Sequence, residues 1–103
     1  MESPSQELFR QIRETMTPDK LRFARVHHLA KAISADIAEP QRASHLNSQF
    51  RGAYLDLQLA ILRSNDTALI DLYRQHCTKT AEQMCKAASA PVRPDAEPGL
   101  VAR

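Results

Sequence analysis

The sequence predicts an all-α protein, a small helical bundle of one short and three long helices with a disordered C-terminal tail. Two observations argue against strands. The 103 residues include only two glycines and five aromatic side chains, and no segment shows the alternating β-branched pattern of a strand. A third observation favours helices, because Ser-Pro, Thr-Pro and Glu-Pro pairs stand where apolar residues at helical spacing begin.

A chain of 103 residues fits one domain. We expect residues 1–88 to form the helical bundle and residues 89–103 to form the disordered tail. The tail sequence, SAPVRPDAEPGLVAR, is rich in proline and alanine and has no apolar periodicity. A domain this small buries roughly 60–65% of the surface of its unfolded chain, so its stability is modest and self-association would add to it.

Each helix has a start signal. Ser3, Pro4 and Gln6 form a capping-box pattern that starts the short helix, which we expect to reach about Met16 with one apolar face (Leu8 or Phe9, Ile12 and Met16). "TPDK" starts a second helix over 17–38. "EP" ends that helix and starts a third over 40–64, and "SND" ends the third and caps a fourth that continues to about residue 88.

The second and fourth helices have one apolar face each when residues are placed at ~100° per position. In the second helix the face consists of Phe23, Val26, Leu29, Ala30, Ile33 and Ile37. In the fourth helix it consists of Leu69, Ile70, Tyr73, Cys77, Ala81, Met84 and Ala88. Both patterns are typical of helices that pack one side against a bundle.

The third helix has two apolar faces. One comprises Leu46, Phe50, Ala53, Tyr54, Leu57, Ala60 and Ile61, and the opposite one comprises Leu55, Leu59 and Leu62. Either this helix is central and covered on both sides, or one face meets another chain. Gly52 costs about 1 kcal/mol relative to alanine in the middle of a helix, so we expect a neighbouring backbone to approach it closely.

The second face of this helix predicts a partner or dimer interface, because large apolar side chains on a helix are the usual anchors of such contacts. We expect arginines from the third and fourth helices, among them Arg74, to form its polar rim. The predicted interface residues are Arg51, Tyr54, Leu55, Leu59, Leu62 and Arg63.

An alternative function comes from "RVHHLAKAIS" at residues 25–34. The segment resembles part of the H-x-L-K-G motif of histidine phosphotransfer domains, which are small helical bundles. His27 is followed by Leu29 at the offset of that motif, but Lys31 stands one position late and Ala32 stands near the place of the glycine. We expect His27 to be exposed, opposite the apolar face of its helix.

The sequence offers no metal or catalytic pattern. The four histidines form no H-x-x-x-H and the two cysteines form no C-x-x-C, so we expect no metal site. Cys77 and Cys85 lie ~12 Å apart along one helix, beyond disulfide reach, and two free thiols fit a reducing cytoplasm. Without a nucleophile elbow, a phosphate-binding glycine loop or paired buried acids, we expect neither an enzyme nor a cofactor.

Nucleic acid and membrane are unexpected partners. The net charge is only +2, and basic residues are interleaved with acidic ones. Residues 29–49 are similar to a helix-turn-helix, which leaves a small DNA-binding protein as a further alternative, although Pro40 would break the recognition helix. No apolar run approaches the ~18 residues of a membrane span, and "MESPSQELF" lacks the pattern of a secretory signal, so we expect a cytoplasmic protein.

In length and organisation the chain resembles the small all-helical bacterial anti-activators that bind LuxR-type quorum-sensing transcription regulators. The shared features are the all-helical pattern, the lack of a catalytic motif and the two-faced helix "FRGAYLDLQLAILRS" at residues 50–64. The resemblance implies a protein that covers its partner's dimerisation helix with an apolar helix face. We therefore expect a bacterial, non-enzymatic homodimer that binds another protein, a transcription regulator, and inhibits it.

Overall fold

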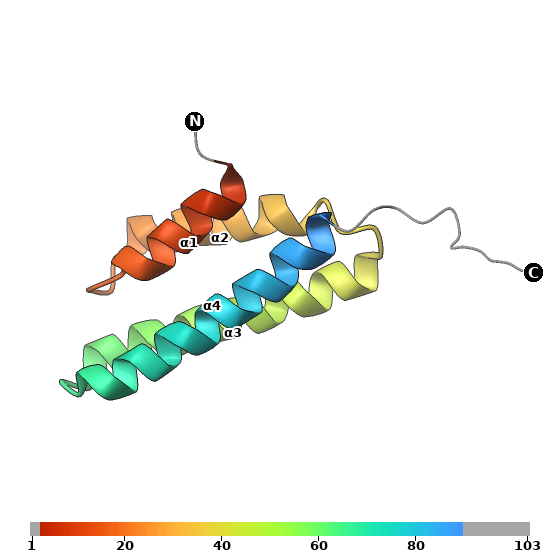
Figure 1. Cartoon of the computed structure of the whole chain (residues 1–103). Coiled ribbons are helices and arrows are strands. Elements are labelled where there is room, and N and C mark those ends of the chain that lie inside the picture. The colour runs from red at the N-terminus through yellow and green to blue at the C-terminus, as the bar shows by residue number, and fades with distance from the viewer. Residues whose placement is uncertain (1–2, 90–103) are drawn as a thin grey trace, which may run out of the picture.

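The computed structural model describes residues 3–89, which form four helices joined by short connections (Figure 1). The helices are α1 (Pro4–Glu14), α2 (Lys20–Ser34), α3 (Pro40–Arg63) and α4 (Thr67–Ser89). No strand occurs within residues 3–89, and the prediction of one short and three long helices is confirmed. The predicted tail starts too early, because Ser89 belongs to α4, and its remaining residues, 90–103, lie outside the described range.

The helices form two antiparallel pairs. α3 and α4 lie side by side as a long hairpin, and α1 and α2 form a second pair packed on it (Figure 1). α1 contacts α4, and α2 contacts both α3 and α4. The core between the pairs contains the apolar residues that helical spacing predicts on α2 and on the first face of α3, together with Leu8, Ile12, Cys77, Ala81 and Met84. One side of the α3–α4 hairpin therefore has no helix from residues 3–89 against it.

The start of α1 follows the predicted capping box. The Ser3 hydroxyl accepts a hydrogen bond from the backbone N–H of Gln6, and the Gln6 side chain accepts one from the backbone N–H of Ser3. α2 starts later than predicted, at Lys20, because Asp19 and not Thr17 is its N-cap. The Asp19 carboxylate accepts hydrogen bonds from the next free backbone N–H groups, which satisfies donors that have no partner inside the helix.

The end of α1 differs from the prediction for a physical reason. The backbone leaves the helical conformation at Thr15 (φ −70°, ψ 109°), so α1 stops at Glu14 rather than at Met16. Thr15 turns inward and is completely buried, whereas Met16 is exposed. Met16 was expected on the apolar face of the helix, and it is not there because it no longer follows the helical register.

Two side chains from the α3–α4 hairpin hold this end of α1 in place. The Tyr54 hydroxyl lies 3.0 Å from the Thr15 hydroxyl, which itself donates to the carbonyl oxygen of Gln11 at 2.6 Å. Nη1 of Arg74 on α4 donates to the carbonyl oxygens of Ile12 at 2.6 Å and Thr15 at 3.0 Å. A guanidinium group at a helix C-terminus satisfies free carbonyls and complements the helix dipole.

Of the remaining boundaries, the end of α2 differs most from the prediction. α2 ends at Ser34 rather than near residue 38, and Ile37 nevertheless remains buried in the connection to α3. α3 begins at Pro40, as predicted, and α4 follows Asp66, whose carboxylate accepts hydrogen bonds from the backbone N–H groups of Ala68 and Leu69. Pro40 thus starts a helix instead of interrupting one.

Candidate protein-binding surface

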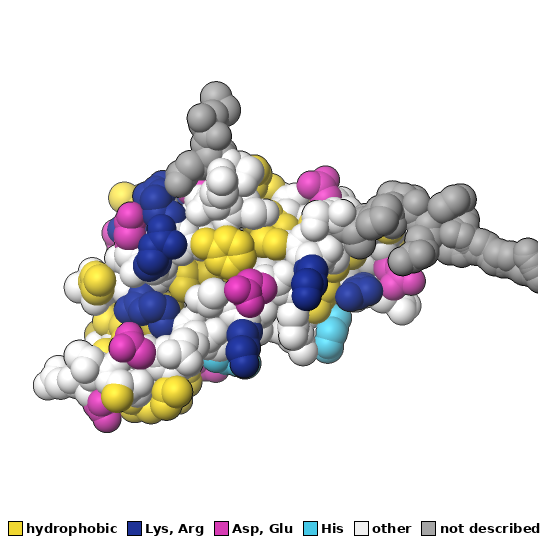
Figure 2. Space-filling view, viewed as in Figure 1, with side chains coloured by type: hydrophobic (Ala, Val, Ile, Leu, Met, Phe, Trp, Pro, Cys, Tyr) yellow, Lys and Arg dark blue, Asp and Glu magenta, His cyan; other side chains and the backbone are white. Residues whose placement is uncertain are grey.

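Five leucines lie exposed on the open side of the α3–α4 hairpin. Their side chains are between 39% and 65% exposed, in a chain whose other described leucines, Leu21 apart, are buried. We call this set the outer leucine surface: Leu55, Leu59 and Leu62 on α3, and Leu69 and Leu72 on α4. Figure 2 looks onto the α4 side of the molecule, where hydrophobic side chains reach the surface over the first turns of α4.

The position of these leucines follows from helix geometry. At ~100° per residue, Leu55, Leu59 and Leu62 lie opposite the buried face of α3 that contains Phe50 and Leu57. Because α1, α2 and α4 cover only the buried face, the second apolar face of α3 has no cover within residues 3–89. The alternative that α3 is a central helix covered on both sides is thereby contradicted.

A groove runs along this side between α3 and α4. It consists of two hollows of 440 and 420 Å³ that share Asp56. The first hollow is polar in character and is lined by His76 and Lys79 among others. The second lies between Leu59 on α3 and Leu69 on α4. The lining of the groove therefore becomes more apolar from the first hollow to the second.

Gly52 borders the polar hollow and has open space in front of it. A Cβ atom built at this position would meet nothing within 4 Å. The expected close approach of a neighbouring backbone is therefore absent within residues 3–89. The cost of a glycine in mid-helix is not offset by any contact inside the described part of the fold.

The arginines predicted for a polar rim, and the tyrosine predicted as an anchor, have different positions in the structure. Arg51 and Arg63 are both exposed on α3. Arg74 is not part of the rim, because its guanidinium group holds the end of α1. Tyr54, expected among the anchors of the interface, is only 2% exposed and stacks on Phe50 with ring centroids 6.2 Å apart, so it belongs to the core.

Leu69 and Leu72 are the part of this surface that the sequence analysis missed. Leu69 was expected on the buried face of α4, but it is 39% exposed and lines the second hollow opposite Leu59. Leu72 lies off the predicted apolar face. The signal available in the sequence was this large apolar residue outside the apolar face of an amphipathic helix. Such a signal is weak, because single leucines are common on protein surfaces.

His27 does not lie as the phosphotransfer alternative requires. We expected it on the exposed side of α2, but it is half-buried, and it lines a small recess with Phe23, Phe50 and Arg51. Its Nδ1 atom is buried and has no hydrogen-bond partner among the described residues. The adjacent His28 is the exposed member of the pair. The position of His27 at the α2–α3 contact argues against a phosphate acceptor there.

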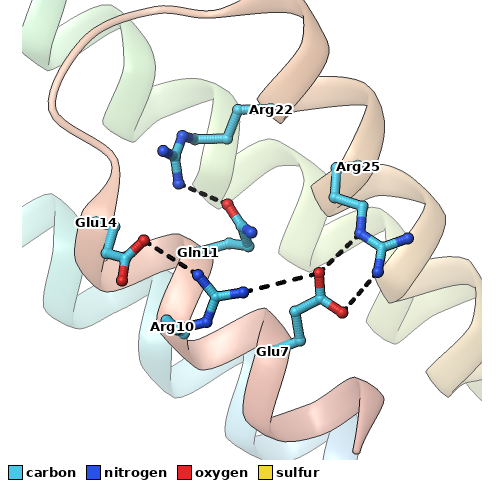
Figure 3. Close-up of polar contacts among 6 residues, drawn as sticks. All are labelled: Glu7, Arg10, Gln11, Glu14, Arg22 and Arg25. Carbon is cyan, nitrogen blue, oxygen red and sulfur yellow. Dashed lines mark hydrogen bonds and ion pairs between the residues drawn. The ribbon is translucent and has the colours of Figure 1, made fainter. Parts of the chain in front are cut away.

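A second polar cluster joins α1 to α2 (Figure 3). The Glu7 carboxylate accepts two hydrogen bonds from Arg25, at 2.8 Å from Nε and 2.6 Å from Nη2. Hydrogen bonds from Arg25 hold the pKa of Glu7 below its ordinary value. Arg10 adds ion pairs to Glu7 and Glu14. Every acid in this cluster is paired with a base, so the cluster stabilises the helix pair and offers no free acid or base for catalysis.

Both cysteines within residues 3–89 are free thiols. Burial raises the pKa of Cys77 to about 12, and burial also raises the pKa of the half-buried Cys85. Thiols with raised pKa values are poor nucleophiles. No group of three or more His, Cys, Asp or Glu side chains suited to a metal ion occurs in the described part of the chain.

None of the helices within residues 3–89 combines the length and the apolar character needed to cross a membrane. Comparison of the chain with protein-family models, with curated proteins and with solved structures finds no match.

Proposed function

We propose that this chain is a non-enzymatic, cytoplasmic regulatory protein that binds another protein through the outer leucine surface. The observation that carries the proposal is the position of Leu55, Leu59 and Leu62, which lie exposed on the side of α3 that faces away from the core. Because these leucines are already partly covered, an interface would bury only the exposed part of each side chain. Each therefore contributes less than the about 1.5–3 kcal/mol of a fully exposed leucine, and several are needed together to offset the cost of association.

The groove beside these leucines favours a helical ligand. A helix laid between α3 and α4 would place apolar residues at one end, between Leu59 and Leu69, and polar residues at its other end, toward Lys79. A helix of this kind at the dimer interface of a transcription regulator is the partner that we propose. By occupying that helix, the protein would act as an anti-activator and prevent the regulator from dimerising.

The test is an affinity pull-down from the lysate of its own host, comparing the wild type with two leucine-to-glutamate variants. Leu59→Glu places a charge in the outer leucine surface. Leu21→Glu makes the same change at an exposed leucine on α2 and serves as the matched control. We expect one regulator to be retained by the wild type and by Leu21→Glu and to be lost with Leu59→Glu.

The purified regulator then decides the mode of action. Addition of the wild-type protein should convert the regulator from dimer to monomer and reduce its binding to DNA, and Leu59→Glu should do neither. Retention of the same regulator by Leu59→Glu, with unchanged inhibition, would contradict the proposal.

A further inference from the structure

The outer face of α3 carries a longer pattern than three leucines. Ser48, Gly52, Leu55, Leu59 and Leu62 recur at spacings of four, three, four and three residues. This alternation is the pattern of the seam between two helices of a coiled coil. Leu55, Leu59 and Leu62 are exposed, and nothing within the described chain approaches Gly52. α3 therefore carries one half of a two-helix seam. None of α1, α2 and α4 supplies the other half.

The leucine part of this pattern is complementary to itself when its direction is reversed. Leu59 lies near the middle of the leucines, with Leu55 four residues before it and Leu62 three residues after it. A second α3 running in the opposite direction would place its Leu62 against Leu55 and its Leu59 against Leu59. A two-fold axis near Leu59 generates both contacts at once, as isologous interfaces require.

The charges at the edge of the seam obey the same symmetry. Asp56 and Arg63 lie on the α4 side of the leucines, seven residues apart, and both line the apolar hollow. In the antiparallel arrangement, Asp56 of one chain lies close to Arg63 of the other. Their positions along the helix axis differ by about two residues, or ~3 Å. Two such pairs of opposite charge form around the axis, one on each side of it.

We propose that the outer leucine surface of the isolated protein binds a second copy of this chain, with the two α3 helices antiparallel about a two-fold axis near Leu59. This inference rests on the proposed function, because it concerns the same surface, and it adds a regulatory consequence. The dimer covers the leucines, so the regulator must compete with the second copy for them. The fraction of protein able to bind the regulator then depends on the concentration of the protein itself.

The first measurement is sedimentation velocity of the purified full chain without any partner. We expect a species with twice the 11.6 kDa mass of the chain at tens of micromolar protein. Leu59→Glu should weaken the dimer at least tenfold, and Leu21→Glu should leave it unchanged. A wild-type chain that stays monomeric up to millimolar concentration overturns the inference, and it leaves the proposed function open because the pull-down does not depend on self-association.

Charge reversal tests the symmetry. Asp56→Arg or Arg63→Asp alone turns both attractive pairs into repulsive ones, and we expect each to weaken the dimer roughly tenfold. The double variant Asp56→Arg/Arg63→Asp restores both pairs and should return the dissociation constant to near the wild-type value. Additive losses in the double variant overturn the antiparallel arrangement.

Cysteine cross-linking tests the register, in a Cys85→Ser background with Cys77 left buried in the core. Leu59→Cys should form an intermolecular disulfide on oxidation. Leu55→Cys alone and Leu62→Cys alone should not, because each would lie ~10 Å along the axis from its own copy. A mixture of the two single variants should form the mixed disulfide. Disulfides in all three single variants would indicate a parallel pair and overturn the proposed geometry.

Discussion

The hydroxyl of Tyr54 on α3 lies 3.0 Å from the hydroxyl of Thr15, the residue that ends α1, and both side chains are buried. This bond joins residues that are 39 positions apart in the chain. It explains why a tyrosine rather than a phenylalanine fits this site, since a buried hydroxyl needs a partner and Thr15 supplies one.

Replacing Tyr54 with phenylalanine should therefore destabilise the protein modestly while leaving the core packing intact. The change removes one buried hydrogen bond, and Thr15 keeps its bond to Gln11, so the expected loss is about 0.5–1.5 kcal/mol in the free energy of unfolding. Urea denaturation measures it. Tyr73→Phe on α4 is the matched control, because the Tyr73 hydroxyl makes no hydrogen bond among the described residues. Equal losses in both variants would contradict the assignment.

Arg74 should matter more than an ordinary surface arginine. Arg74→Met keeps the apolar stem but removes the donors that satisfy the carbonyl oxygens of Ile12 and Thr15, and we expect a loss of about 1–3 kcal/mol. Amide hydrogen exchange should accelerate in α1 before it does in α3. Arg42→Met, at an exposed arginine in the first turn of α3, should change neither quantity. Uniform acceleration throughout the chain would show that Arg74 does not act on α1 in particular.

The Glu7–Arg25 pair should make the stability of the protein depend on pH in the acidic range. Because Arg25 lowers the pKa of Glu7 in the folded protein, the stabilisation is fully present above the ordinary value of 4.5 and is lost as the pH falls through the lowered folded value. In Glu7→Gln, the stability should fall less steeply below about pH 4.5 than in the wild type. Thermal denaturation across this range measures the slope. Glu82→Gln, at an exposed glutamate that has no ion pair among residues 3–89, should keep the wild-type slope.

Gly52→Ala should stabilise the isolated chain. A methyl group there meets nothing within 4 Å, and alanine in a helix interior is favoured over glycine by about 0.5–1 kcal/mol. The free energy of unfolding should be compared with and without Gly52→Ala in the Leu59→Glu variant, in which self-association does not contribute to the unfolding equilibrium. A destabilised variant would show that this stretch of α3 needs the glycine within its own chain.

The sequence was sufficient for the helices and most of the core because both depend on local patterns. Each of these patterns involves residues that are close together in the sequence, as in the capping box at Ser3, the helix start at Pro40 and the apolar spacing of α2.

The end of α1 at Thr15 was missed because contacts with Tyr54 and Arg74 fix it, and no local pattern records those contacts. At the end of α2 the hydrogen bonds are local, and nothing in the residues from Ser34 to Ala38 marks the boundary as a proline or glycine would.

The candidate surface was only partly predictable for a related reason. Both faces of α3 are apolar in sequence, and whether the smaller face of three leucines is covered depends on where α1 and α2 pack. Tyr54 and Arg74 were assigned to an interface because their partners, Thr15 and Ile12, lie far away in the chain and no periodicity connects them.

The bonds from Arg74 to α1 also bear on the order of folding. Arg74 and Ile12 are separated by 62 positions, whereas α3 and α4 are joined by a short connection and pack along their length. Contacts between near neighbours close small loops and form early, while contacts of high sequence separation form late. The α3–α4 hairpin should thus assemble first. α1, although synthesised before the other helices, must wait for α4 to leave the ribosome before its C-terminal end can be fixed.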